Sequence, residues 1–243
     1  MIIKKLQTYH YLYGMHHEHH LKSSDTIRDI VIGMSDGLTV PFALAAGLSG
    51  AISSSGIVVT AGIAEIVAGS IAMGLGGFLA GKTEADHYES ELKREYDEVE
   101  RVPEQEKYEV KAVFADFGLS EDLQHEIAEE MAKDKDKWVD FMMRYELGLE
   151  KPEANRASQS AITIGLSYIV GGIIPLSPYF FISDSQKALY YSCIITTMCL
   201  FVFGYLKSKV TGQPPVSGAL KVLFIGALAA AAAFFMAKLI NGK

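Results

Sequence analysis

Two isolated carboxylates lie inside long apolar runs in the first third of this 243-residue chain. Asp36 lies within Ile30–Ala51 and Glu65 within Gly56–Ala80, and neither run holds another charged residue. Each run has at least the roughly 20 residues that a helix needs to span a bilayer. A carboxylate in hydrocarbon costs about 2.5 kcal/mol or more, so it usually faces a protein interior or a water-filled path. The pair therefore predicts an ion pathway between two membrane-spanning helices.

Three further apolar runs, at Ala157–Pro178, Ala188–Leu206 and Val216–Ile240, raise the number of predicted spans to five. The fold class is thus an all-α polytopic membrane protein, in which an odd number of spans places the termini on opposite sides. Lys and Arg gather before the first run, after the second and after the fourth, which predicts a cytosolic N-terminus. No signal-peptide pattern precedes the first run.

These runs divide the chain into four predicted segments. Residues 1–26 form a cytosolic tail that contains His16, His17, His19 and His20. Residues 27–81 hold transmembrane helices 1 and 2, residues 82–156 a cytosolic helical insertion, and residues 157–243 helices 3 to 5. Alternation of histidines around Glu18 defines no coordination geometry, so the tail is either a weak accessory metal binder or has no such role.

The insertion, residues 82–156, concentrates the negative charge of the chain. It carries 23 acidic and 12 basic side chains, whereas the rest of the chain carries 6 and 10. This balance favours a cation as partner and argues against nucleic acid. Several glutamates share helix faces, and such like-charge pairs cost about 0.2–0.5 kcal/mol each unless something compensates them. Because no lysines are placed to do so, we expect a bound cation; a merely solvated acidic face is the alternative.

Span two also carries groups suited to a metal path and to helix association. Glu65, Gly69 and Met73 recur at i, i+4 and i+8, and a thioether suits Fe(II) or Cu(I) better than Mg(II). A parallel stripe of small residues would let another helix approach closely. The stripe consists of Ala68, Ala72, Gly76 and Ala80. Structural roles, in which both carboxylates bond neighbouring helices and Met73 simply packs, remain open.

Three motifs give the chain a specific resemblance. The runs 29–48 (DIVIGMSDGLTVPFALAAGL), 64–74 (AEIVAGSIAMG) and 84–88 (EADHY) resemble the vacuolar iron transporter family. The resemblance implies a homodimer with a metal path between the first two spans of each subunit. It also implies Fe(II) export from the cytosol into a vacuole in exchange for protons, with no prosthetic group. In a bacterium the membrane would be the plasma membrane.

The resemblance assigns roles to individual residues. The path residues it implies are Asp36, Glu65 and Met73. The metal-binding residues it implies in the cytosolic domain are Glu95, Glu98, Glu106, Glu109, Met142, Met143 and Glu146. The sequence does not rank Fe(II) against Mn(II), Co(II) or Zn(II) as cargo.

Two other classes of function compete with a transporter. A membrane-bound di-iron carboxylate oxidase would use the acidic helices, but the Glu-x-x-His pairs of that class are missing. A membrane-anchored metal sensor would need the spans only as an anchor, and an anchor has no use for Asp36 and Glu65. We therefore expect a transporter and no enzyme.

Overall fold

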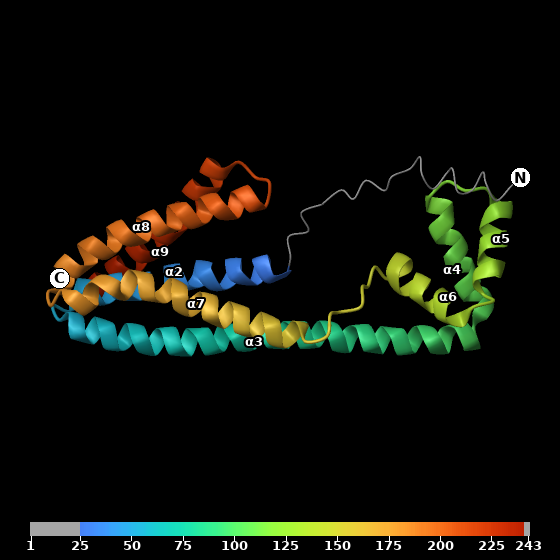
Figure 1. The fold of residues 1–243 in the computed structure, drawn as a ribbon, viewed down its shortest axis with the longest axis horizontal. Helices are drawn as coiled ribbons and strands as arrows, with labels where there is room; N and C mark the ends of the chain where they lie inside the picture. The colour runs from blue at the N-terminus through green and yellow to red at the C-terminus, as the bar shows by residue number, and fades with distance from the viewer. Residues whose placement is uncertain (1–24, 241–243) are drawn as a thin grey trace, which may run out of the picture.

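The structure is a computed structural model that describes residues 25–240. Five of the helices in this range are long and apolar enough to cross a membrane. They are α2 (Asp25–Ala51), α3 (Ser55–Arg101), α7 (Arg156–Phe181), α8 (Ser185–Val210) and α9 (Pro215–Ile240). Figure 1 shows them side by side in one elongated bundle. The predicted all-α fold with five apolar helices is confirmed.

Helix α3 reaches far beyond the bundle. Its 47 residues make a helix about 70 Å long at a rise of 1.5 Å per residue, more than twice the thickness of a hydrocarbon core. The helix continues from the apolar run through Gly81 into the insertion without a break. The inserted helices sit at the far end of α3, away from the other spans (Figure 1). These are α4 (Pro103–Asp116), α5 (Glu121–Met131), α6 (Lys135–Phe141) and the π-helix η1 (Met142–Glu146).

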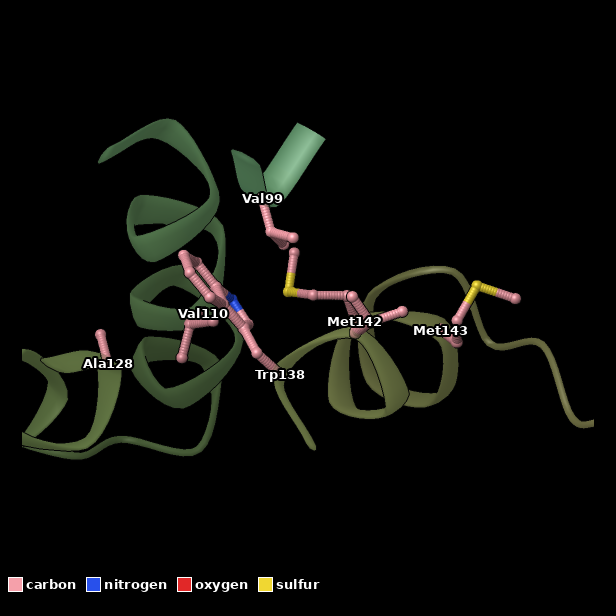
Figure 2. Packing of buried hydrophobic residues seen from close by; sticks show 7 residues of the cluster. Val99, Val110, Ala128, Trp138, Met142 and Met143 are labelled. Atoms are coloured by element: carbon pink, nitrogen blue, oxygen red, sulfur yellow. The ribbon is translucent and has the colours of Figure 1, made fainter. Parts of the chain in front are cut away.

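The insertion has its own small apolar core. Trp138 packs between α3 and α4 with Val99 and Val110, and Met142 extends its thioether toward Val99 (Figure 2). Local signals in the sequence define the helix ends. Pro103 opens α4, and Gly118 adopts a φ of 78° between α4 and α5, where a Cβ would be strained. The core holds the faces of α3, α4 and η1 together at the end of the long helix.

The bundle contains an internal repeat, in which α2–α3 and α7–α8 are two copies of one helical hairpin. Within the bundle, the buried positions of α3 are 55, 58, 62, 66, 70 and 74, and those of α8 begin with 185, 188, 192, 196, 200 and 204. At the turns the two copies bond each other reciprocally. The backbone N–H of Ser55 donates to the carbonyl of Ser183 (3.2 Å), and that of Ser185 donates to Ser53 (3.1 Å). A pseudo-twofold axis therefore passes between the turns.

Helices α2 and α7 meet along a glycine seam that ends in a buried ion pair. A Cβ on Gly33 would lie 2.3 Å from the carbonyl oxygen of Ile164, so the two backbones touch there. Where both helices begin, Arg156 donates from Nη1 and Nη2 to the two carboxylate oxygens of Asp29, at 2.6 and 3.1 Å. Asp25 adds a contact of 3.2 Å to the Nε of Arg156.

Helix α2 extends beyond the apolar run Ile30–Ala51 at its N-terminal end. Helix α2 begins at Asp25, so Asp29 is a third carboxylate of this helix and is only 2% exposed. Its charge is tolerated because Arg156 neutralises it at close range.

We predict that Asp29→Ala destabilises the bundle strongly. Removing one member of a buried ion pair leaves the other charge unpaired, which typically costs about 3–5 kcal/mol. Arg28→Ala is the matched control, because Arg28 makes only an exposed 3.6 Å contact with Asp25. Thermal unfolding of the purified variants should show a large fall in Tm for Asp29→Ala and almost none for the control. Equal Tm values would show that the pair contributes little.

Candidate functional site

Among the described residues, the carboxylates of the bundle differ in how well they are satisfied. Asp29 has both oxygens bonded to Arg156. Glu65 accepts one short hydrogen bond at Oε1 from the hydroxyl of Tyr168, while its Oε2 is buried without a partner. Asp36, partly buried, makes no hydrogen bond or ion pair with any residue in 25–240. The two carboxylates singled out in the sequence are thus the two that lack full compensation.

Tyr168 of α7 is the residue that the sequence did not suggest. It is 2% exposed, its ring fills a space that Gly69 leaves open, and Gly37 allows α2 to approach its backbone. A Cβ on Gly69 would lie 2.5 Å from its Cζ and hydroxyl oxygen, and one on Gly37 would lie 2.3 Å from its carbonyl oxygen. Gly69 therefore makes room for the tyrosine that holds Glu65. The signal in the sequence was a lone phenol in the middle of an apolar run.

Met73 and the small-residue stripe of α3 lie toward the outside of the bundle. Met73 is half-buried two turns beyond Glu65, and Ala68, Ala72 and Gly76 are exposed. A Cβ on Gly76 would meet nothing within 4 Å among the described residues. Glu65 and Met73 thus lie at the border between the bundle interior and a surface that this part of the chain leaves uncovered.

In the acidic insertion, two glutamates are buried without full compensation. Glu95 of α3 and Glu106 of α4 are each 2% exposed, and each has an Oε2 atom without a hydrogen-bond partner. Both lie outside the apolar part of the chain. Burial, followed by the charges of Glu146 and Glu98, raises the pKa of Glu95 to about 7. Burial, followed by Glu109 and Glu95, raises the pKa of Glu106 to about 7 as well. Such orphaned oxygens suit a cation.

The other predicted ligands surround this pair. Glu98, Glu109 and Glu146 all act on the pKa of Glu95 and of Glu106, so α3, α4 and η1 bring the five carboxylates into one electrostatic cluster. Burial and the charge of Glu109 raise the pKa of Glu146 too. Even so, no three His, Cys, Asp or Glu side chains between residues 25 and 240 are arranged as ready ligands of one metal ion. The glutamates therefore form an electrostatic cluster but not a complete metal-coordination shell.

An arginine, to which the expectation about lysines did not extend, compensates part of the charge on this face. Arg94 lies beside the cluster, with guanidinium nitrogens 2.7 Å from Glu91, 3.4 Å from Glu98 and 3.9 Å from Glu95. Arg94 and Glu98 are spaced i, i+4 on α3, so their contact follows from helix geometry. The side chain of Arg94 is about half exposed, so its compensation is partly screened by solvent.

The two predicted methionine ligands are both buried, but they differ in direction. Met142 extends toward Val99, whereas Met143 extends to the opposite side of the turn, and both belong to the apolar core of the insertion (Figure 2). The π-helical turn, in which Leu147 N–H bonds the carbonyl of Met142, places both residues beside Glu146 in one turn. His16, His17, His19 and His20 lie outside the described residues.

Comparison with known proteins decides the family. The VIT family profile matches residues 27–238. The chain belongs to the VIT family. The "Vacuolar iron transporter" of Centaurea cyanus is 54% identical over 94% of this chain and 93% of its own length. "Vacuolar iron transporter 1" of Arabidopsis thaliana is 52% identical over 93% of this chain and 90% of its own length. "Protein CCC1" of Saccharomyces cerevisiae is 40% identical over 88% of this chain and 69% of its own length.

Membership of the VIT family confirms the resemblance drawn from the three sequence motifs. The matched region contains both the carboxylates of the bundle and the acidic insertion. Transporter names among the relatives also support the prediction that the chain is not an enzyme.

We predict that Gly69→Ala disturbs the Tyr168 slot. The new methyl group would lie 2.5 Å from the ring, and overpacking of this kind costs about 1–3 kcal/mol. Gly56→Ala, whose methyl group would only touch Ser54 Oγ at 3.7 Å, is the matched control on the same helix. Thermal unfolding should show a Tm lower by about 2–4 °C per kcal/mol lost for Gly69→Ala alone. If both variants melt together, the slot is less tight than the geometry indicates.

Proposed function

We propose that this protein is a proton-coupled antiporter that moves Fe(II) from the cytosol into a vacuole. The observation that carries the proposal is that Asp36 and Glu65 both lack full compensation within the bundle. The names of the relatives supply the cargo and the compartment, since they are called vacuolar iron transporters. The oxidase and sensor alternatives find no comparable support in these names.

The coupling follows from the chemistry of a carboxylate short of partners. Glu65 Oε2 is buried without a hydrogen bond, and either a proton or a cation would satisfy it. Since the two compete for the same oxygens, binding of Fe(II) releases a proton and protonation releases the metal. Met73 adds a thioether that favours Fe(II) over Mg(II). Mn(II), Co(II) and Zn(II) are further candidate cargoes of the same site.

The path is completed by a second copy of the chain. The exposed stripe formed by Ala68, Ala72, Gly76 and Ala80 suits close helix packing. The internal repeat supports this arrangement, because the second hairpin has Leu166 and Ile195 where the first has Asp36 and Glu65. One chain therefore supplies a single pair of path carboxylates. In a homodimer joined along the stripe, two pairs would face each other.

The acidic insertion would collect metal before it enters the path. With the N-terminus in the cytosol, as the distribution of Lys and Arg favours, the insertion also lies in the cytosol. Fe(II) would take oxygens from Glu95 and Glu106, which are buried and lack partners, and from their neighbours Glu98, Glu109 and Glu146. Met142 and Met143 would add soft donors after a local rearrangement of the π-helical turn. In the absence of metal, Arg94 compensates part of the negative charge of these glutamates.

We predict that Asp36→Asn and Glu65→Gln each abolish Fe(II) transport while the protein remains folded. An amide has nearly the same shape but cannot exchange a proton or bind a metal as an anion. Lys221→Gln is the control, because it removes a charge from another spanning helix, α9. Uptake of Fe(II) into proteoliposomes is the measurement. Wild-type flux in either carboxylate variant would remove that residue from the path.

A second prediction concerns Arg94. Because its positive charge competes with a bound cation, Arg94→Gln should tighten metal binding by up to about fivefold. Arg101→Gln is the control, since Arg101 pairs with Asp97 instead, at 3.6 Å. Trp138, the single tryptophan of the chain, lies in the core of the insertion and should report binding of Co(II) by fluorescence quenching. Weaker binding in Arg94→Gln would mean that the arginine organises the site instead of competing for it.

A third prediction separates metal collection from metal passage. Replacing Glu95, Glu98, Glu106 and Glu109 together by Gln should raise the Fe(II) concentration needed for half-maximal uptake, while part of the maximal rate survives. The path carboxylates are untouched in this variant, and single changes should be mild because neighbouring acids can substitute as ligands. Initial uptake rates against Fe(II) concentration test this. Loss of the maximal rate with unchanged apparent affinity would place the insertion within the transport step itself.

A further inference from the structure

An apolar cavity lies on the other side of α2 from the glycine seam. It has a volume of about 350 Å³ and is bounded by α2, α8 and α9. Phe42 closes it on α2, Cys193 and Leu200 on α8, and Ala227, Ala231 and Phe234 on α9. No residue that lines it is charged. An apolar cavity of this size is suited to a hydrocarbon group and not to water.

The cavity exists because α9 changes partners along its length. Near their shared turn, α8 and α9 are in close contact, since a Cβ on Gly204 would lie 2.8 Å from the Cα of Ala219. Farther along, α9 approaches α2 instead, with the carbonyl oxygen of Ala233 3.3 Å from a Cβ on Gly47. Between these contacts α9 presents alanines, which are too small to fill the space that it leaves beside α8.

We propose that this cavity seats one acyl chain of an anionic glycerophospholipid. Its walls belong to membrane-spanning helices, so the surrounding medium is lipid. The cation that selects the lipid is Lys238, whose Nζ lies 5.3 Å above the ring centroid of Phe234, a residue of the cavity wall. Lys238 is in the last turn of α9, where a lysine reaches the headgroup level.

The selectivity for an anionic lipid must come from its headgroup more than from its acyl chain. A hydrocarbon tail gains little by leaving bulk lipid for an apolar groove, because both are equally apolar. An ammonium group at the end of the groove does distinguish an anionic headgroup from a zwitterionic one. The bound acyl chain would also contact Phe42, the residue after Pro41, on the helix that carries Asp36. A lipid bound in the cavity would thus stabilise the position of the part of α2 that follows Pro41.

Native mass spectrometry of the full-length purified protein tests this proposal. The protein is mixed with equal amounts of phosphatidylglycerol and phosphatidylcholine that carry the same acyl chains. We expect preferential retention of one phosphatidylglycerol per chain. Lys238→Gln should reduce this preference about fivefold, as expected for the loss of one interfacial charge. Ala231→Phe, which fills the cavity, should abolish it.

Two control variants sharpen the test. Lys187→Gln removes an exposed charge at the same end of the bundle, from the first turns of α8, and Ala232→Phe adds the same bulk one residue outside the cavity wall. Both should retain phosphatidylglycerol as the wild type does. Equal retention of the two lipids would overturn the proposal, as would a preference that survives Ala231→Phe. If Ala231→Phe instead changes the number of chains in the complex, the cavity is covered by a second copy and not by lipid.

Discussion

A carboxylate buried among apolar helices needs a partner, and this requirement organises the whole bundle. Asp29 is satisfied completely by Arg156 and thereby fastens the first turns of α2 to α7. Glu65 is satisfied at one oxygen by Tyr168, which the same α7 carries. Asp36 has no hydrogen bond or ion pair within the described part of the chain. The gradation separates a structural carboxylate from two that remain available to a ligand, although all three lie on the first two long helices.

Much of this could be predicted from the sequence, because the controlling signals are local. The length of each apolar run predicts a spanning helix, and Pro103 and Gly118 mark helix ends by their backbone chemistry. Isolated charges within the runs identified Asp36 and Glu65. The partners were not predictable in this way, because Arg156 and Tyr168 lie more than 100 residues away from Asp29 and Glu65. Their roles depend on the packing of α7 against α2 and α3, which no spacing along one helix reveals.

The acidic insertion follows the same physical rule in a different setting. Glu95 and Glu106 are buried with unpartnered oxygens, and their raised pKa values reflect burial first and neighbouring acids second. Arg94, whose side chain is about half exposed, approaches this cluster from solvent and compensates part of its charge. In the membrane part no mobile cation of the chain reaches Asp36 among the described residues. We therefore propose different tasks for the two groups of carboxylates, reversible collection of metal in the insertion and exchange of a proton for a metal in the bundle.

The measurement that tests this account most directly follows iron and protons in the same vesicles. Proteoliposomes that contain a pH-sensitive dye receive Fe(II) on the outside with no pH gradient imposed. Exchange at under-compensated carboxylates predicts that Fe(II) uptake makes the vesicle interior more alkaline, in fixed proportion to the iron taken up. Protein-free vesicles provide the baseline. Fe(II) uptake that leaves the internal pH unchanged would contradict the account, because the carboxylates would then pass metal without exchanging protons.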